Sequence, residues 1–326
     1  MSKIDPTKSK LLREKWERDF RKRFGAFKKD LWNLVAKENA FGLEGNPLLN
    51  TRWKARQSKD KLKLFTTWMA TKFKAIHSND KHWERYIQEA YDKGGRSAFD
   101  STRKGAKALA SSQKQLDFYE GTRAEFLHSS FNTPIAKEKV QMMASRVFSD
   151  LEGVTEAMGT QMNRTLTDGI VSGISPRVMA RNLVKDVDKI GKNRALTIAR
   201  TETVRVHAEG QLDAFEILGV EELGVMTEWN TAGDDRVCPL CEPLNGIVVK
   251  PKEARGMIPR HPNCRCAWVP ANVGESTKGQ VRGRSGVKSR LDTSVKAEIP
   301  KGDPRRTIAE QKKVSRWVGA GKQIAK

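Results

Sequence analysis

The sequence predicts a mainly α-helical protein that carries one small α+β module built around cysteine and histidine. Apolar side chains recur every three or four residues through most of residues 1–218, which is the periodicity of amphipathic helices. After Gly224 the pattern changes to short apolar runs separated by Gly, Asp, Pro and Asn, which is typical of small strands and loops. All four cysteines lie in this later region.

Three regions follow from the pattern. A basic helical domain is expected at residues 1–130. Residues 131–272 are expected to form a helical lead-in that ends in a Cys/His module at 225–270. The basic tail at 273–326 is expected to be flexible, apart from one short helix near 308–317.

Residues 9–38 form the first predicted helix. Its apolar stripe consists of Leu12, Trp16, Phe20, Phe24, Phe27, Leu31 and Leu34. Its other face is basic and carries Lys15, Arg18, Arg21, Lys22, Lys28 and Lys29. Burial in a bundle or against a neighbouring subunit is favoured over a membrane surface. We expect an exposed stripe that becomes ordered only against a partner subunit, although folding back onto the Cys/His module stays open.

Further helices are predicted at 59–91, 113–130, 135–172, 176–188 and 193–218. Gly94 and Gly95 are expected to end the first of these, and the small, polar and basic residues of 94–113 predict a linker. Ser175 and Pro176 have the residue types of an N-cap and a first helical position.

The charge is large and unevenly distributed. The formal net charge is +22 over the whole chain, with +11 at 1–100, −7 at 201–250 and +12 at 251–326. A positive charge of this size usually binds phosphates, an acidic membrane surface or an acidic protein. Residues 1–18 are charged throughout and no run of about 18 apolar residues occurs, so neither a classical export signal nor a membrane span is expected.

The cysteines have the spacing of metal ligands. Cys238 and Cys241 form a CxxC pair, and after nineteen further residues come His261, Cys264 and Cys266. A CxxC turn followed by an HxxC element supplies four ligands for tetrahedral zinc. In an extended CxC segment the two side chains point to opposite faces. The preferred set is therefore Cys238, Cys241, His261 and Cys264, with Cys266 as the alternative ligand.

Two other interpretations of the cysteines stay open: buried thiols that pack without metal, and disulfides formed after release from the cell. A catalytic zinc is disfavoured, because four protein ligands leave no open position and no spare Glu or His beside the motif suggests a base that activates water.

The ordered combination of residues in this half of the chain resembles the phage Mu F-like minor head protein family, also called head morphogenesis proteins. The residues that carry the resemblance are Ala199, Arg200, Thr201, Glu202, Thr203, Ala208, Gly210, Glu228, Trp229, Thr231, Asp234, Arg236, Cys238, Cys241, Gly246 and the run His261–Cys266. The stretch at 166–175 is similar to the helical lead-in of that family. The resemblance covers about 137–272.

The resemblance implies a virion component near the portal vertex of a phage head, present in few copies and acting in head assembly and in DNA packaging or ejection. It implies no catalysis. The partners it implies are a portal or head–tail connector protein, a major capsid or scaffolding protein, and double-stranded DNA. During assembly such a protein is expected in the host cytoplasm.

Two functions of other classes are weighed against this one: a zinc-ribbon-like, DNA-binding regulatory protein, and a DNA-processing or toxin enzyme. Arg200, Glu202 and Asp234 could be read as a catalytic constellation of nucleotide-transferring toxins. No phosphate-binding Gly-rich loop or paired catalytic carboxylates accompany them. They are therefore interpreted as an ion-pair and capping network that ties the 193–218 helix to the Cys/His module.

DNA binding independent of sequence is expected of the basic N-terminal helices and of the tail. The tail residues expected to contact phosphates are Arg282, Arg284, Lys288, Arg290, Arg305, Arg306, Lys312 and Lys313. Positive charge can bind acidic protein as well as DNA, so acidic surfaces of a connector protein are the alternative target.

Overall fold

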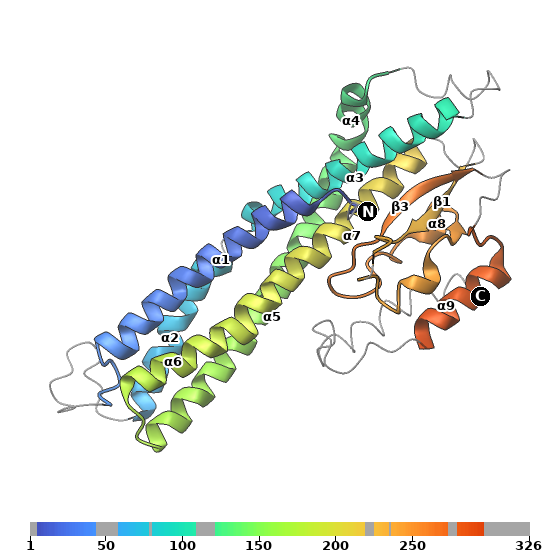
Figure 1. Ribbon diagram of the computed structural model, residues 1–326. Coiled ribbons are helices and arrows are strands. Elements are labelled where there is room, and N and C mark those ends of the chain that lie inside the picture. Colours follow the sequence, from blue (N-terminus) through green and yellow to red (C-terminus); the bar gives the residue numbers. More distant parts are fainter. Residues whose placement is uncertain are drawn as a thin grey trace. The chain divides into compact units, whose positions relative to one another are not determined.

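The computed structural model describes residues 5–43, 58–77, 80–108, 121–218, 225–234, 236–272 and 279–296. The larger helices are α1 (Lys10–Trp32), α2 (Ser58–His77), α3 (Asp80–Ala108), α4 (Arg123–Phe131), α5 (Pro134–Val171), α6 (Pro176–Asp186), α7 (Asn193–Ile217) and α9 (Arg284–Lys296) (Figure 1). The shorter helical segments are η1 (Asn33–Lys37), η4 (Val187–Lys192), η5 (Glu242–Leu244) and α8 (Pro251–Ala254). The strands are β1 (Val225–Asn230), β2 (Val248–Val249) and β3 (Ala267–Asn272). The predicted fold class, mainly α with a small α+β module, is confirmed.

The chain divides into two compact units, and each is described by itself. One unit consists of Met1–Arg13, Glu84–Met143 and Arg200–Lys326, and the other of Glu14–Trp83 and Ala144–Ala199. The boundaries fall inside α1, α3, α5 and α7. The domain limits expected at residues 130 and 272 are limits of independently folding regions. The division into two units does not test them, so they stay predictions.

The apolar stripe of α1 lies in the core of the second unit. The helix predicted at 9–38 is confirmed as α1 continued by the π-helix η1. Trp16 and Phe20 are fully buried, and the ring of Phe20 stacks on Trp83 with centroids 4.6 Å apart. Phe27 packs against Phe73 from α2, with centroids 5.5 Å apart. The expectation of an exposed stripe that needs a partner subunit is wrong, because α2 and the start of α3 supply its aromatic partners.

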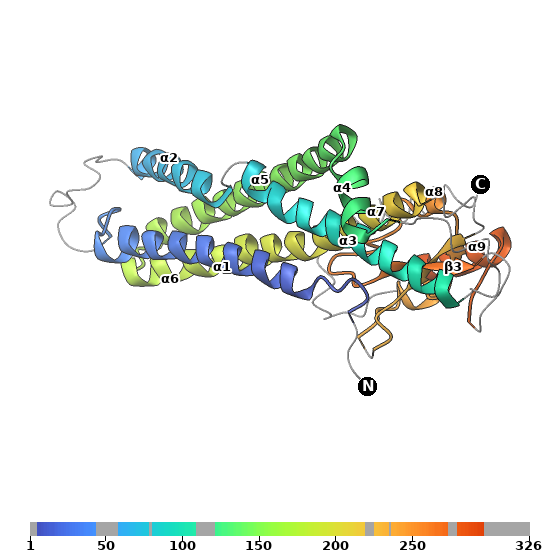
Figure 2. The same cartoon turned by 90° about the horizontal axis from the view of Figure 1, so that it is seen from above.

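The α6–η4 segment also runs alongside α1 (Figure 2). Lys28 of α1 donates to Asp188 of η4 over 3.0 Å. A side chain at Gly191 would collide with Phe24 of α1 and Met158 of α5. The helix predicted at 176–188 is confirmed as α6, which begins at Pro176 as expected. The hydroxyl of Ser175 makes no capping hydrogen bond, so this N-cap position has no side-chain cap.

Gly94 and Gly95 do not end a helix, which corrects the linker expected at 94–113. Helix α3 continues through both glycines to Ala108. A Cβ at Gly94 would lie 2.1 Å from the carbonyl oxygen of His207, and a Cβ at Gly210 would lie 2.2 Å from that of Tyr91. The missing side chains let the backbones of α3 and α7 touch, so these glycines mark a helix crossing.

The remaining predicted helices are found with altered limits. The stretch expected at 59–91 is divided into α2 and the first part of α3. Helix α4 begins only at Arg123, where Thr122 and Glu125 form a capping box; residues 109–120 lie outside the described part of the chain. The helices expected at 135–172 and 193–218 are confirmed as α5 and α7.

The small module contains an antiparallel sheet in the order β2-β1-β3. Two of the short apolar runs after Gly224, VMTEWN and GIVV, contain β1 and β2 as expected of small strands, whereas β3 was not predicted. Trp229 and Trp268 are paired across β1 and β3, fully buried and edge to face. The side chain of Gln211 in α7 donates to the carbonyl of Trp268 and accepts from its N–H, at 2.7 and 3.1 Å. This amide pair fixes the sheet to α7.

The tail begins with an ordered helix, which corrects the expectation of flexibility for residues 284–296. Helix α9 buries Val287, Leu291 and Ser294. The short helix predicted at 308–317 lies outside the described residues. No helix in the described ranges is long and apolar enough to cross a membrane.

Candidate metal centre

The CxxC pair lies on a tight turn between β1 and β2. The backbone N–H groups of Cys241 and Glu242 both donate to the carbonyl of Cys238, at 2.9 and 3.0 Å, and η5 follows at once. The turn brings the two thiols to the same side of the chain. Both cysteines are 2% exposed.

The second group of ligands lies on the loop that precedes β3. The N–H of Cys264 donates to the carbonyl of His261 over 3.2 Å, and Asn263 takes a positive φ of 59° inside this turn. The N–H of Asn263 also donates to the hydroxyl of Thr201 in α7 over 3.0 Å. The loop is therefore held by its own turn and by the helix.

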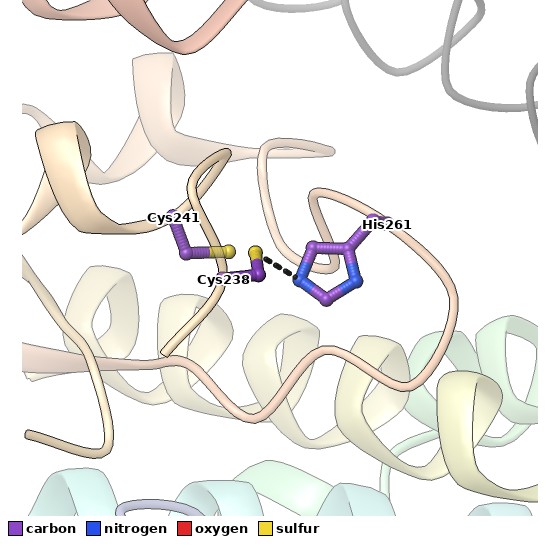
Figure 3. Close-up of side chains that lie close together, drawn as sticks. All are labelled: Cys238, Cys241 and His261. Carbon is purple, nitrogen blue, oxygen red and sulfur yellow. Dashed lines mark hydrogen bonds between the residues drawn. The ribbon is translucent and has the colours of Figure 1, made fainter. Parts of the chain in front are cut away.

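The two groups meet in one buried cluster. The sulfur of Cys238 lies 2.9 Å from Nε2 of His261, toward which it points in Figure 3. The sulfurs of Cys241 and Cys264 are 3.9 Å apart, close to the spacing of about 3.8 Å that tetrahedral zinc with Zn–S bonds of about 2.3 Å requires. Two triads have donor atoms within 4.8 Å of one another: Cys238 with Cys241 and His261, and Cys241 with Cys264 and Cys266. These groups could hold a metal ion.

The placement of Cys266 differs from the expectation. Cys264 and Cys266 were expected to point to opposite faces, yet both sulfurs lie beside Cys241. The reason is local, because residues 264–266 are irregular and β3 begins only at Ala267. The alternation of a strand does not apply before that residue. The structure thus brings all five candidate ligands together.

The histidine is oriented as a ligand would be. Nδ1 of His261 donates to the carbonyl of Pro262 over 2.7 Å, which leaves Nε2 directed at the cysteines. Metal-binding histidines usually donate their other ring N–H to a carbonyl or carboxylate in this way. His261 is 4% exposed, so a polar partner inside the cluster is required.

The cluster favours thiolates at Cys238 and Cys264 beside a charged imidazole, whereas the pKa values of the Cys241 and Cys266 thiols are raised. Hydrogen bonding to Cys241 is the main cause that lowers the pKa of Cys238 to about 5, against the effect of burial. Burial opposes charge on His261, but hydrogen bonds to Cys238 and Cys264 raise its pKa to about 10. Thiolates are the form in which cysteine binds metals.

Of the three residues expected to form one network, Asp234 and Glu202 are each seen to accept hydrogen bonds from another arginine. Asp234 accepts two hydrogen bonds from the guanidinium of Arg265, at 2.7 and 2.6 Å, and these lower the pKa of its carboxyl group. Glu202 accepts from Arg205 on its own helix over 3.2 Å. Thr201 makes one link between α7 and the Cys/His loop. The ion-pair and capping network expected from Arg200, Glu202 and Asp234 stays a prediction.

The basic tail residues are placed only in part. Arg284, Lys288 and Arg290 are exposed on α9, while Arg282 is half-buried and donates to Gln280 over 2.9 Å. The other four, Arg305, Arg306, Lys312 and Lys313, lie outside the described residues. Sequence reasoning missed Gln211, since an amide carries no motif of its own. Thr201 and Arg265 were named only among the residues that carry the family resemblance, and their contacts with Asn263 and Asp234 were not predicted.

Comparison with known proteins identifies one domain. The model of the family described as Phage Mu protein F like protein matches residues 160–269. This span includes the last part of α5, the helices α6 and α7, the CxxC turn and all five candidate metal ligands. No curated protein and no solved structure matches the chain. The chain therefore carries a Phage Mu protein F-like domain at residues 160–269, as expected of a phage head morphogenesis protein.

Proposed function

We propose that the protein is a minor head protein of a bacteriophage, bound near the portal vertex and acting in head assembly and in DNA packaging or ejection. The family match over the Cys/His domain carries the proposal. The partners are a portal or connector protein and a capsid or scaffolding protein. The role is structural and not enzymatic, because a cluster closed by four buried protein ligands offers no position to a substrate.

A complementation assay tests this role. The gene is deleted from the phage that encodes it, and particles are counted by electron microscopy after complementation with wild-type protein or with none. The expected result is a loss of DNA-filled heads without the protein and their recovery with it. Normal yields of filled, infectious particles in the deletion strain would contradict the proposal.

The second part of the proposal is a structural zinc ion bound by Cys238, Cys241, His261 and Cys264. The orientation of His261 and the 3.9 Å separation of two sulfurs support it. Structural zinc contributes on the order of 10–16 kcal/mol of binding free energy at neutral pH, so removal of the ion by a chelator is expected to unfold the module.

Elemental analysis of the purified full-length chain is expected to find one zinc per protein. The matched pair of variants is Cys264→Ser, which should lose the metal, and Cys266→Ser, which should keep it. The reverse result would make Cys266 the fourth ligand. Absence of stoichiometric metal from wild-type protein prepared under reducing conditions would show that the cluster is not a structural zinc site.

The third part is binding of double-stranded DNA without sequence preference. Support comes from the exposed basic side chains of α1 (Lys15, Arg18, Lys22 and Lys29) and of α9 (Arg284, Lys288 and Arg290). If about six phosphates are neutralised, affinity should fall roughly a thousandfold between 50 and 200 mM salt. A flat salt titration would point to acidic protein surfaces as the target, and a strong preference for one sequence would favour a regulatory DNA-binding protein.

A further inference from the structure

Arg260 is a buried cation beside the Cys/His cluster. It directly precedes His261 and is 1% exposed. Its Nε donates to the hydroxyl of Ser294 in α9 over 3.0 Å, and that hydroxyl donates to the carbonyl of Leu240 in the CxxC turn over 2.6 Å. The side chain is thus held between α9 and the turn that presents Cys238 and Cys241.

The two terminal nitrogens of this guanidinium, Nη1 and Nη2, have no hydrogen-bond partner among the described residues. Burying a charged group without partners costs several kcal/mol, and five N–H donors make the guanidinium especially demanding. Of the acidic side chains that the structure describes in the module, Asp234 is bound by Arg265, Glu253 accepts from the backbone of Lys250, and Glu228 accepts from Gln280. Glu242 and Asp292 are exposed. A compensating negative charge must come from elsewhere.

The cysteines are the groups that can provide it. Arg260 adjoins His261 in the sequence, and Ser294 connects it to the carbonyl of Leu240, which lies between Cys238 and Cys241. A divalent metal held by three thiolates and a neutral imidazole has a net charge of −1, and one held by four thiolates has −2. Either centre is an anion in a buried position, which requires a nearby positive charge.

We propose that Arg260 is the buried counter-charge of the metal–thiolate centre, acting through the charge of its guanidinium. The inference rests on the proposed metal site and holds for either choice of fourth ligand. Arg260 does not itself bind the metal. It is a positioning residue that neutralises the centre, and Ser294 of α9 holds it in place.

Cobalt(II) substitution in the full-length protein tests the inference, because the sulfur-to-cobalt charge-transfer band reports on the thiolates directly. Affinity is measured by competition with a chelator for the wild type, Arg260→Met and Arg260→Lys. The methionine variant should bind cobalt about 10- to 100-fold more weakly, as expected when a group that supports the ligands is lost. Its band should move to lower energy, because the sulfurs lose the charge that stabilises their electrons. The lysine variant keeps the charge and should show a smaller shift and a smaller loss.

Arg255→Met is the matched control. Arg255 donates to Glu209, Asp213 and Glu216 at 2.9, 2.7 and 2.7 Å, so its loss disturbs an ion-pair network of the same unit without removing a charge assigned to the centre. This variant should keep the wild-type band. An equal loss of affinity in both methionine variants, with no band shift in either, would mean that Arg260 only stabilises the fold and would overturn the inference.

The outcomes separate the inference from the proposal beneath it. Failure of the wild type to bind cobalt or zinc would refute the metal site and the inference together. A wild type that binds metal and an Arg260→Met protein with the same affinity and band would refute the counter-charge alone. If Arg260→Met does not fold, Arg260→Gln takes its place, since it removes the charge and keeps an amide donor for Ser294; wild-type affinity and band in that variant would also overturn the inference.

Discussion

Replacing Gly210 by alanine tests the crossing of α3 and α7. The new Cβ would lie 2.2 Å from the carbonyl oxygen of Tyr91 and 3.0 Å from its carbon. Carbon–oxygen contacts of this kind need about 3.3 Å, so the two backbones must separate by about 1 Å. Overpacking of a tight contact lowers the free energy of unfolding by about 1–3 kcal/mol. We expect a value near ~3 kcal/mol here, because both sides of the contact are rigid backbone. The gain in helix propensity offsets about 1 kcal/mol, which leaves a net loss of about 2 kcal/mol.

Gly153→Ala provides the comparison, because a Cβ at this helical position meets nothing within 4 Å. It should stabilise the protein by roughly 1 kcal/mol through helix propensity alone. Unfolding in urea, followed by circular dichroism at 222 nm, should therefore separate the two variants by about 3 kcal/mol. Gly94→Ala, on the other side of the crossing, should behave like Gly210→Ala. A Gly210→Ala protein as stable as Gly153→Ala would refute the close approach of these helices.

Three further results are expected. Phe20→Ala should lower the free energy of unfolding by about 3–5 kcal/mol, since its fully buried ring stacks on Trp83; a loss below 1 kcal/mol in a urea titration would contradict the packing. Deletion of residues 1–50 should abolish the cooperative melting of the second unit. An unchanged melting curve would mean that α1 is not part of its core and binds a partner subunit instead. Burial raises the pKa of Asp213, but Lys139, Tyr91 and Arg255 together lower it. The ionised carboxylate of Asp213 should contribute fully to the free energy of unfolding above its unfolded pKa of about 4, and this contribution should be lost as the pH falls through the lower pKa of the folded state. Asp213→Asn should therefore make the urea midpoint fall less steeply below about pH 4.

Local patterns were sufficient to predict most helices and the cysteine cluster. The three-and-four spacing of Trp16, Phe20 and Phe24 specifies a helix and its buried face whatever that face packs against. The CxxC and HxxC spacings likewise bring donors together because each lies within one turn. In both cases the information lies within a few residues of sequence.

The errors concern contacts between distant parts of the chain. Gly94 has the composition of a helix end, and only the backbone of His207, far along the sequence, explains why it lies inside α3. The burial of the α1 stripe depends on residues of α2 and α3 whose pairing is not encoded in the stripe itself. The expected alternation of Cys264 and Cys266 assumed a strand, whereas β3 begins only at Ala267, after both cysteines.

A component of the phage head must be present in purified particles. Particles of the encoding phage are purified on a density gradient, and the protein is quantified against the major capsid protein by mass spectrometry with labelled peptide standards. We expect the protein to sediment with the heads, in a small and constant number of copies. If it is absent from filled, infectious particles and found only in the unassembled fractions of the lysate, the protein is not a head component.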